Sequence, residues 1–467
     1  MPPAVRTRRS TVVPLPSAGG TGSPSVDVVV PLSPLDTRWA ALPPVCHVFL
    51  FPAAAHQQQV PFSDVVRGLK SSLAAVLPAF HTLAGELAYS PELGTVTIVC
   101  GEDAGVAFVE AETDLDLASL VVEDDDGTAD LDLDALPQLV PDIRREVLPA
   151  PMFAAQVTEF ARGIALGVAL NHVATDGIGF FRFMQMWPAS AVAAGATSSD
   201  CTWTWTEPLH DRRFVRFDGD QELARRLLRQ AAPDLPRIVP KQQGATPHRP
   251  LLLSRRTFTF SAHALRRLKQ RLTAAVGPGV VGAAAPSTFA TLAAHGWVSF
   301  ALASGFTDAA PVFAVFLADC RAHMSPRVPD AYAGNCVISC VVALGGAELT
   351  GADGPALAFL AIRDAAVEVK RDPLAGSGSW ITRFRAAPPG RKVVLAGSPR
   401  FPAYAVDFGF GRPARVERAS LDEDGAMAIF AGREAGSVQA SVAVTAGKMP
   451  VFHRTFAVKS GSNKARL

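Results

Sequence analysis

The chain has 467 residues, of which 49% are hydrophobic and 19% are charged, with 37 glycines and 37 prolines. This composition is typical of a globular protein and excludes wholesale disorder, and the length allows two or three domains of ordinary size. Lys and Arg number 44 against 43 Asp and Glu, so the net charge of +1 argues against a broad basic surface for nucleic acid or an anionic membrane.

The N-terminal segment 6–11 is basic and lacks acids, which is a feature of transit peptides, but it leads directly into Val12 and Val13. We therefore interpret it as the start of the first strand. No apolar run reaches the ~18 residues of a membrane-spanning helix. The six cysteines are scattered without a CxxC pair, and Cys336 and Cys340 have no further metal ligands nearby in the sequence. We expect buried free thiols in a reducing, cytoplasmic compartment and no metal site.

The first half mixes strands and helices. Apolar residues spaced by three and four predict a helix over 64–77, which Pro78 ends. The acid-rich segment 123–134 lacks the ligand spacing of a calcium loop, so we interpret it as a solvated loop. Apolar and alternating runs predict strands over 28–30, 95–100 and 106–110, a hairpin of 153–160 and 164–170 that turns at Arg162–Gly163, and then a helix over 180–187.

Residues 189–250 break this pattern and predict a long crossover that contains one helix, over 221–231. The second half restarts with an alternating strand over 257–260, and Ser261 is placed to cap the helix that follows. Another helix begins at Pro286 and runs through Trp297, with His295 packed inside it. The remaining strands are predicted over 312–317, 336–344, 392–395, 426–430 and 437–444. The fold class is therefore α/β.

One pattern carries candidate chemistry. His172 and Asp176 form an HxxxD sequence directly after an apolar strand, and Gly177 follows, which allows a sharp turn and leaves room for a ligand. Imidazole has the pKa that suits proton transfer near neutrality. Since HxxxD alone is expected by chance about as often as not, the surroundings rather than the spacing make His172 a candidate catalytic residue.

Two motifs and several flanking segments resemble the plant acyl-CoA-dependent acyltransferases of the BAHD family. His172 to Asp176 matches the family's HxxxD motif, and Asp407-Phe408-Gly409-Phe410-Gly411 matches its DFGWG motif with Phe410 in place of Trp. Thr82, Glu86 and Ala333 depart from the family pattern. The flanking matches occur in family order and are most similar to the subgroup that acts on anthocyanins and other phenolic glycosides: Leu83–Gly85, Pro208 with Asp211 and Arg212, Ser287–Phe289 with Trp297, Asp319–Arg321, Tyr332–Cys336 and Ser398–Phe401.

The resemblance implies two chloramphenicol acetyltransferase-like domains of similar size with a central channel at their interface. We expect an N-terminal domain over 1–195, a crossover linker over 196–250 and a C-terminal domain over 251–467. It further implies a monomer without a cofactor, which uses acyl-CoA as co-substrate and a small phenolic acceptor. No nucleic acid or membrane partner is expected.

The resemblance also assigns roles. His172 is expected to act as general base on an acceptor hydroxyl, with no acyl-enzyme, and Asp176 to pair with Arg321 and hold the loop. Asp407 to Gly411 are expected to act by packing. Ser398 and Trp380 are candidates for the oxyanion donor or the pocket wall. Ser287 and Thr288 are expected either to cap their helix or to contact CoA, and Arg400 or the pair Arg255–Arg256 to meet its phosphates.

The acyl donor stays open between malonyl and hydroxycinnamoyl. Malonyl-using relatives often carry a basic residue directly after Asp-Gly, where this chain has Ile178, and Arg182 lies four residues further on. Alternatives within the family are an amine or a simple alcohol as acceptor, and a binding protein without activity is an alternative of another class. A peptide-assembly condensation domain, with its HHxxxDG motif, is disfavoured because Asn171 precedes His172.

Overall fold

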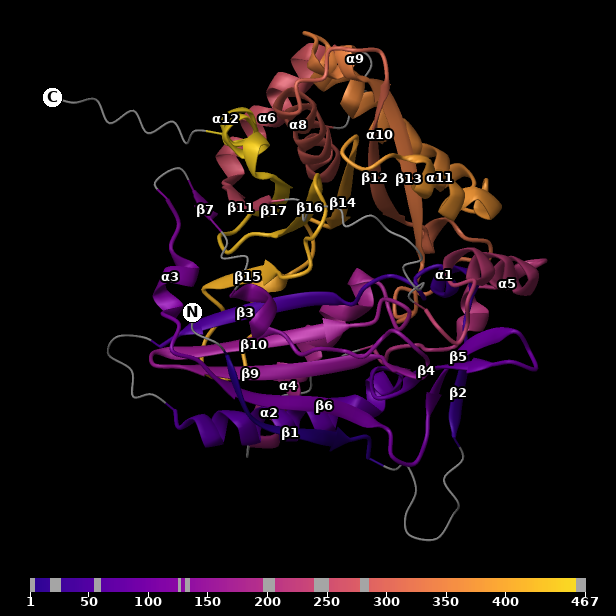
Figure 1. Ribbon diagram of the computed structural model, residues 1–467, viewed down its shortest axis with the longest axis vertical. Coiled ribbons are helices and arrows are strands. Elements are labelled where there is room, and N and C mark those ends of the chain that lie inside the picture. The colour runs from indigo at the N-terminus through magenta and orange to yellow at the C-terminus, as the bar shows by residue number, and fades with distance from the viewer. Residues whose placement is uncertain are drawn as a thin grey trace, which may run out of the picture.

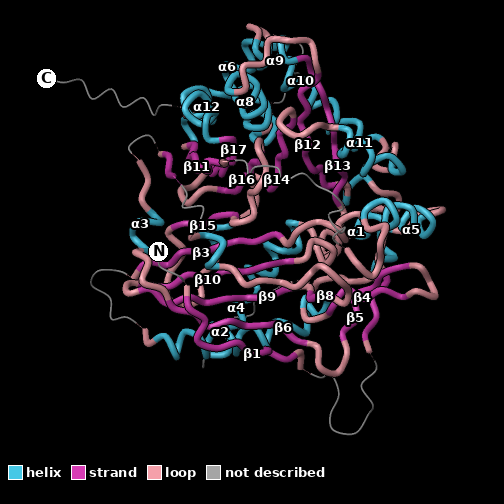
Figure 2. Tube along the Cα trace, in the orientation of Figure 1, coloured by secondary structure: helices cyan, strands magenta, loops and turns pink. Residues whose placement is uncertain are grey.

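The computed structural model describes residues 5–16, 27–53, 60–124, 127–130, 135–195, 206–238, 252–277 and 285–458. Within them the chain forms two large β-sheets, one above the other in Figures 1 and 2, and a smaller sheet beside the lower one. The α/β fold class is confirmed.

The lower sheet has six strands and carries the predicted hairpin at its centre. Neighbouring strands are antiparallel except for β6 and β9, which are parallel. The hairpin turns at Gly163, whose positive φ of 126° suits glycine. In spatial order the strands are β1 (Arg6–Pro14), β6 (Gly105–Glu112), β9 (Phe153–Phe160), β10 (Gly163–Leu170), β3 (Val45–Pro52) and β15 (Arg415–Arg418).

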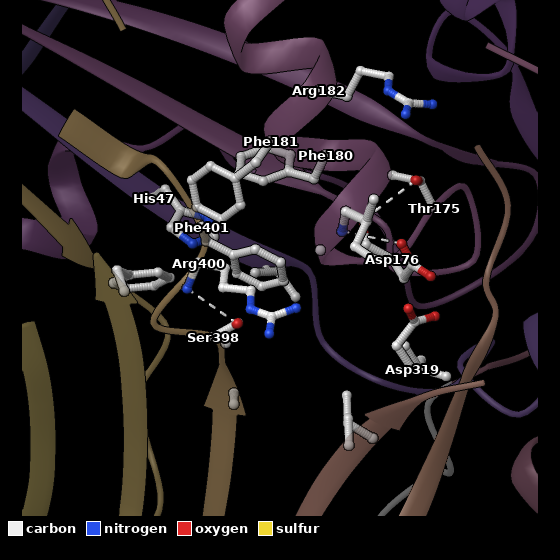
Figure 3. A pocket seen from close by; sticks show the side chains of 18 of the residues that line it. His47, Thr175, Asp176, Phe180, Phe181, Arg182, Asp319, Ser398, Arg400 and Phe401 are labelled. Carbon is white, nitrogen blue, oxygen red and sulfur yellow. Dashed lines mark hydrogen bonds between the residues drawn. The ribbon is translucent and has the colours of Figure 1, made fainter. Parts of the chain in front are cut away.

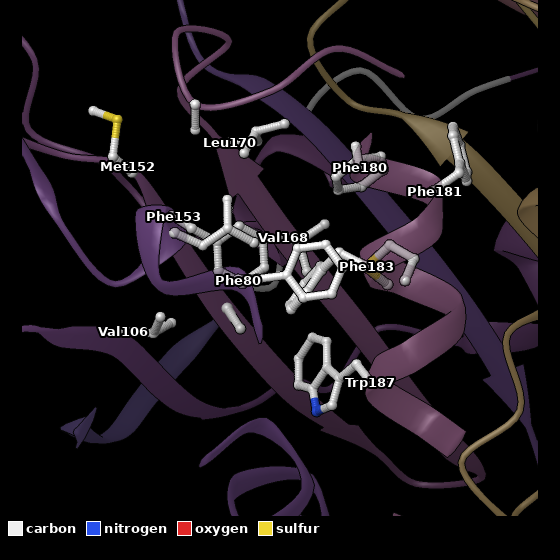
Figure 4. Packing of buried hydrophobic residues seen from close by; sticks show 14 of the residues in the cluster. Phe80, Val106, Met152, Phe153, Val168, Leu170, Phe180, Phe181, Phe183 and Trp187 are labelled. Carbon is white, nitrogen blue, oxygen red and sulfur yellow. The ribbon is translucent and has the colours of Figure 1, made fainter. Parts of the chain in front are cut away.

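Helices α2 (Phe62–Val76) and α4 (Gly177–Gly195) pack on one face of this sheet, and Figure 4 shows side chains of α4 packed with those of strands β6, β9 and β10. Trp187 is fully buried there and donates its indole N–H to the Leu69 carbonyl at 3.1 Å. The expected helix over 180–187 is too short at both ends, because α4 runs from Gly177 to Gly195 and takes in residues 189–195 of the expected crossover. Glycine at the start of the helix carries no apolar signal, and the first backbone N–H groups of the helix donate to the side chain of Asp176.

A four-stranded sheet and short helical segments complete the first half. The segments α3 (Leu117–Val121) and η2 (Leu136–Leu139) cover the other face of the six-stranded sheet. The predicted strands at 28–30 and 95–100 are confirmed. They belong to the sheet of β2 (Val28–Pro31), β5 (Thr95–Cys100), β4 (Glu86–Ser90) and β8 (Ala150–Pro151), near which lie α1 (Pro34–Thr37) and η1 (Leu77–Leu83).

The upper sheet has seven strands, and its helices lie on the side away from the lower sheet (Figure 1). The strands, in order, are β13 (Val337–Gly345), β12 (Pro311–Asp319), β14 (Lys392–Gly397), β16 (Ala426–Ala431), β17 (Val438–Thr445), β11 (Leu253–Phe260) and β7 (Thr128–Asp130). The helices are α6 (Ala262–Val276), α8 (Thr288–Ala303), α9 (Gly346–Thr350), α10 (Gly354–Arg371) and α12 (Met449–Phe456), with α5 (Asp220–Ala231) and α11 (Trp380–Ala386) at the edge.

Two short strands cross between the halves. Strand β7 pairs with β11, and β15 pairs with β3. The interpretation of 123–134 as a solvated loop was therefore wrong at Thr128–Asp130, where Asp130 accepts a hydrogen bond from Arg256 Nε at 2.6 Å. Three residues are too few to show alternation, and their partner is distant in the sequence. The domain limits at 1–195, 196–250 and 251–467 stay a prediction.

The cysteines behave as expected of free thiols. Cys100, Cys320, Cys336 and Cys340 are buried and Cys46 is partly exposed, while Cys201 lies outside the described residues. Among the described residues, no three potential ligands come together as a metal site, and none of the helices is both long and apolar enough to cross a bilayer.

Candidate active site

A cavity of about 530 Å³ is lined by residues of both large sheets (Figure 3). His47, Phe181 and Phe401 lie on one side of this view, and Asp176 and Asp319 on the other. Six of the residues given a candidate role in catalysis or binding line the cavity: His172, Asp176, Ile178, Arg182, Ser398 and Arg400. The other candidate site residues lie outside its lining.

His172 is held between a ring and an amide. It follows the end of β10, and its imidazole stacks on Trp39 with ring centroids 4.2 Å apart and planes 21° apart. Its Nδ1 lies 3.1 Å from the side-chain oxygen of Asn335, which belongs to the other half of the chain. Stacking and the hydrogen bond together fix the plane and the rotation of the ring.

The surroundings of Asn335 determine the tautomer of His172. The amide Nδ2 of Asn335 donates to Asp36 Oδ1 at 2.9 Å and to the carbonyl of His172 at 2.9 Å. Because these acceptors require the NH2 group, the amide oxygen must face the imidazole. The oxygen accepts only, so His172 Nδ1 carries the proton and donates it. The lone pair of the neutral ring is then on Nε2.

Electrostatics keep His172 neutral. Burial lowers the pKa of His172 to about 4, and the positive charges of Arg418 and Arg38 act in the same direction. The negative charge of Asp176 raises this pKa, but by less than burial lowers it. At neutral pH the imidazole is therefore uncharged and can accept a proton.

The carboxylate of Asp176 bonds to several groups around the loop that carries His172. The predicted pairing is present, with Arg321 Nη2 2.8 Å from Asp176 Oδ2 and both side chains almost fully buried. Asp176 Oδ1 accepts the backbone N–H groups of Ile178 and Gly179 at the start of α4, and Oδ2 accepts that of Cys336 at 3.0 Å. The carboxylate thus joins helix α4 to the Cys336 segment of the other half.

A second buried arginine braces the same loop. Arg212 Nη2 donates to the carbonyl of Ala174 at 2.8 Å, and its Nε lies 3.3 Å from Asp36 Oδ2. Asp36 in turn accepts from Asn335. The loop that carries His172 is consequently tied to buried ion pairs on two sides.

The DFGFG segment lies outside the cavity and has the packing expected of it. Asp407 Oδ1 accepts the N–H groups of Gly409 at 2.9 Å and Gly411 at 3.1 Å, and both glycines have positive φ, at 95° and 98°. Phe408 packs edge-on against Trp187 at 5.2 Å between centroids, and Phe410 against Phe51 at 5.0 Å.

Substitutions in this segment should separate backbone strain from ring size. We expect Gly409→Ala to lower the free energy of unfolding by about 1–2 kcal/mol, because a β-carbon there meets no atom within 4 Å but φ is positive. In α2, Gly68→Ala has equal space and helical φ, so it should raise stability by ~0.5–1 kcal/mol. Phe410→Trp should be tolerated. Chemical denaturation measures all three, and equal signs for the two glycine variants would contradict this account.

The two oxyanion candidates lie in different places. Ser398 lines the cavity, and its Oγ accepts the backbone N–H of Arg400 at 3.2 Å, which leaves its own O–H free to donate. Trp380 is buried and does not line the cavity, and the Arg38 guanidinium lies 5.1 Å from its ring centroid. An indole cannot be placed by sequence distance alone, because α11 packs against the edge of the sheet.

The candidate CoA contacts also divide. Ser287 caps α8 by accepting the N–H of Ala290 at 3.1 Å, and neither Ser287 nor Thr288 lines the cavity. Arg400 is exposed and lines it. The alternative pair is engaged elsewhere, because Arg255 pairs with Asp422 and Arg256 with Asp130.

The sequence did not predict that five further residues contribute to the site. Asp36 carried a weak signal, since Ser33 and Asp36 have the spacing of a capping box, which the structure shows. Trp39, His47 and Arg418 lie on segments without a motif. Asn335 stood in a recognised segment, but nothing in the sequence linked it to His172 across 163 positions.

The sequence matches the profile of the Transferase family over residues 7–458. It is 32% identical to the BAHD acyltransferase DCR of Arabidopsis thaliana over 82% of this chain and 77% of that protein. It is 26% identical to phenolic glucoside malonyltransferase 1 of Nicotiana tabacum over 88% of each chain. It is 27% identical to coumaroyl-CoA:anthocyanidin 3-O-glucoside-6''-O-coumaroyltransferase 2 of Arabidopsis thaliana over 91% of each.

Solved structures show the same fold. Vinorine synthase superposes with a TM-score of 0.71 at 19% identity, over 98% of this chain and 99% of that one. TRI101 of F. sporotrichioides, in complex with coenzyme A and T-2, superposes with a TM-score of 0.65 at 17% identity, over 92% and 97%. The two-domain arrangement expected from the sequence is that of these proteins.

Proposed function

The chain belongs to the BAHD acyltransferases of the Transferase family, and on this premise we propose that it transfers an acyl group from acyl-CoA to a hydroxyl of a phenolic, flavonoid or anthocyanin glycoside, with His172 as general base. Family membership makes the protein an acyl-CoA-dependent acyltransferase. The observation that carries the proposed chemistry is a neutral His172, held by Asn335 and Trp39, with its Nε2 lone pair free.

Both substrates are bound together when the reaction starts. The acceptor hydroxyl donates a hydrogen bond to His172 Nε2, and its oxygen attacks the thioester carbonyl as the proton moves to the imidazole. The tetrahedral intermediate then collapses, the C–S bond breaks, and the imidazolium returns the proton to the departing CoA thiolate. General-base catalysis contributes ~10²–10⁴ in rate, and holding two substrates together adds to it.

Residues at the cavity stabilise the charges that develop on the oxyanion and on the imidazole. The Ser398 hydroxyl is free to donate toward the oxyanion. The imidazolium, while it exists, keeps its Nδ1–H bond to Asn335 and is stabilised by the negative charge of Asp176. No nucleophilic Ser or Cys is needed. Arg400, exposed on the cavity lining, is placed to meet a CoA phosphate.

The pH dependence should report the lowered pKa of His172. A base acts only when unprotonated, so activity falls as the pH drops through its pKa. Because burial lowers this pKa from 6.5 to about 4, kcat/KM should be level between about pH 5.5 and 8 and decline only in stronger acid. Initial rates in overlapping buffers, with fluorescence to confirm folding, measure the profile. An inflection near 6.5 would show an ordinary, solvated imidazole.

The acceptor class rests on the relatives. Two of them are named for transfer to phenolic or anthocyanidin glucosides, one with malonyl and one with coumaroyl as the acyl group. The aromatic side chains Phe181, Phe401 and Phe430 line the cavity and suit a flat ring of acceptor or donor.

A donor and acceptor panel tests the proposal. Purified protein would be offered malonyl-, coumaroyl- and acetyl-CoA, each with a flavonoid glucoside and with its aglycone, and the products weighed by mass spectrometry. We expect a mass gain on the glucoside and none on the aglycone. A gain on the aglycone alone, or on an added amine, would overturn the glycoside assignment.

A further inference from the structure

Arg418 reaches the cavity from the strand that crosses between the halves. Strand β15 pairs with β3, and Arg418 lies directly opposite His47 in this register. Directly opposed residues of an antiparallel pair project from the same face of the sheet, and both side chains line the cavity. Burial is the main cause of the lowered pKa values of His172 and His47, and the positive charge of Arg418 adds to both shifts.

The guanidinium of Arg418 has no carboxylate partner among the described residues. Its only hydrogen bond within the described structure is a weak one, from Nε to Ser420 Oγ at 3.5 Å. The two nearest acids in sequence are engaged with other arginines, since Glu417 pairs with Arg415 and Asp422 with Arg255. Burial lowers the pKa of Arg418 by more than the nearby charge of Asp422 raises it, which is the cost of partly desolvating a cation that no described carboxylate pairs with directly.

His47 adds a second unsatisfied group beside this cation. Its side chain is only 4% exposed, and its Nδ1 has no hydrogen-bond partner within the described structure. Burial lowers the pKa of His47 to about 3, with the charge of Arg418 acting in the same direction. His47 is therefore neutral and adds no charge of its own beside Arg418.

The other charges of the cavity do not neutralise Arg418. The two acidic residues of the cavity lining, Asp176 and Asp319, both pair with Arg321, at 2.8 and 2.9 Å. Arg182 donates Nη2 to the carbonyl of Asp330 at 2.9 Å, away from the strand that carries Arg418. Figure 3 shows Arg182 on the opposite side from His47. An anion entering on the His47 side therefore meets Arg418, together with Arg400, which lies on the same side in Figure 3.

We propose that Arg418, beside His47, forms a subsite for a carboxylate group of the substrate. This inference rests on the proposed transferase function and names the class of substrate that the site selects. A carboxylate would supply the missing counter-charge and accept hydrogen bonds from the guanidinium, an arrangement that Arg favours geometrically. The carboxylate belongs either to a dicarboxylic acyl donor such as malonyl-CoA or to a carboxylated acceptor.

For a malonyl donor, the subsite would take the place of the basic residue that this chain lacks at position 178. Ile178 lines the cavity with an apolar side chain, and its backbone N–H is bonded to Asp176. Hydrogen bonds to a charged group are worth enough for a ~10–100-fold preference over the neutral analogue. That preference is what distinguishes the subsite from a merely structural arginine.

Equilibrium binding tests the subsite without requiring turnover. Titration calorimetry would compare malonyl-CoA with acetyl-CoA on one arm, and a 2-carboxyphenyl glucoside with its 2-carbamoylphenyl analogue on the other. The variants are Arg418→Gln and Arg418→Lys, with Arg266→Gln as control, since Arg266 is exposed on α6 outside the cavity lining. Thermal melting checks that each variant is folded.

We expect wild type and Arg266→Gln to prefer the carboxylated ligand on one arm by ~10–100-fold, Arg418→Gln to lose that preference, and Arg418→Lys to retain part of it. The arm that responds identifies the source of the carboxylate. The proposal would be overturned if wild type showed no preference for the carboxylated ligand on either arm, or if Arg418→Gln kept the full preference. If Arg418→Gln does not fold, a full preference in Arg418→Lys would overturn it instead. Preference without turnover on any substrate would contradict the transferase function and leave the subsite standing.

Discussion

Replacing His172 by Ala is expected to lower kcat by ~10²–10⁴ while leaving the melting temperature close to that of wild type. The imidazole lines the described cavity, is neutral, and is oriented by a hydrogen bond to Asn335 of the other half of the chain. Its removal leaves the Asn335 amide oxygen facing cavity water, so little structure is lost. Initial rates of CoA release with acceptor present, together with thermal melts, measure both quantities.

The matched control for this variant is His263→Ala. His263 is exposed on α6 and does not line the cavity, so its loss should change neither rate nor stability. If His172→Ala retains more than about a tenth of the wild-type rate, proton transfer to His172 is not part of the slow step and the assigned base is wrong.

Asp176→Ala is expected to lower the free energy of unfolding by about 3–5 kcal/mol, because it removes the buried carboxylate that pairs with Arg321 and leaves this arginine only the half-exposed Asp319. The same change removes the acceptor for three backbone N–H groups. Chemical denaturation gives the magnitude, and a double-mutant cycle with Arg321→Met isolates the pair.

Asp319→Ala provides the comparison for Asp176→Ala. Asp319 contacts the same arginine at 2.9 Å, but its side chain is 46% exposed, so its removal should cost under about 1 kcal/mol. Equal losses for the two variants would mean that burial does not govern the strength of the pair. A stability near wild type in Asp176→Ala, combined with lost activity, would instead favour a direct chemical role for Asp176.

Individual helices and strands were predictable from the sequence where the spacing of apolar residues, or a turn or cap residue, is itself visible there. The hairpin at Gly163, helix α2 and the cap at Ser261 follow from apolar spacing and turn chemistry, and all three are present. Strands β7 and β15 are three and four residues long and pair with strands far away in sequence. Such pairing depends on the tertiary arrangement, which no local pattern encodes.

The site residues likewise divide into those with a local motif and those brought in only by the tertiary fold. His172 and Asp176 stood in a motif after a strand, and family resemblance supplied Arg321 as the partner of Asp176. The ring beneath His172 and the amide that sets its tautomer come from Trp39 and Asn335, which meet His172 only in the folded chain. Trp380 shows the converse, because its indole N–H is a hydrogen-bond donor by residue type but the folded chain leaves it outside the cavity lining.

Direct transfer in a ternary complex is the central claim, and one experiment addresses it with the wild-type protein. Purified protein is mixed with acyl-CoA, with and without a glycoside acceptor, and CoA thiol, product mass and intact protein mass are followed together. The account predicts CoA and acylated product in equal amounts only when acceptor is present, and no acyl adduct on the protein at any time. CoA release without acceptor accompanied by a stable acyl-protein mass would contradict it, because the acyl group would then pass through a nucleophile that the His172 mechanism does not contain.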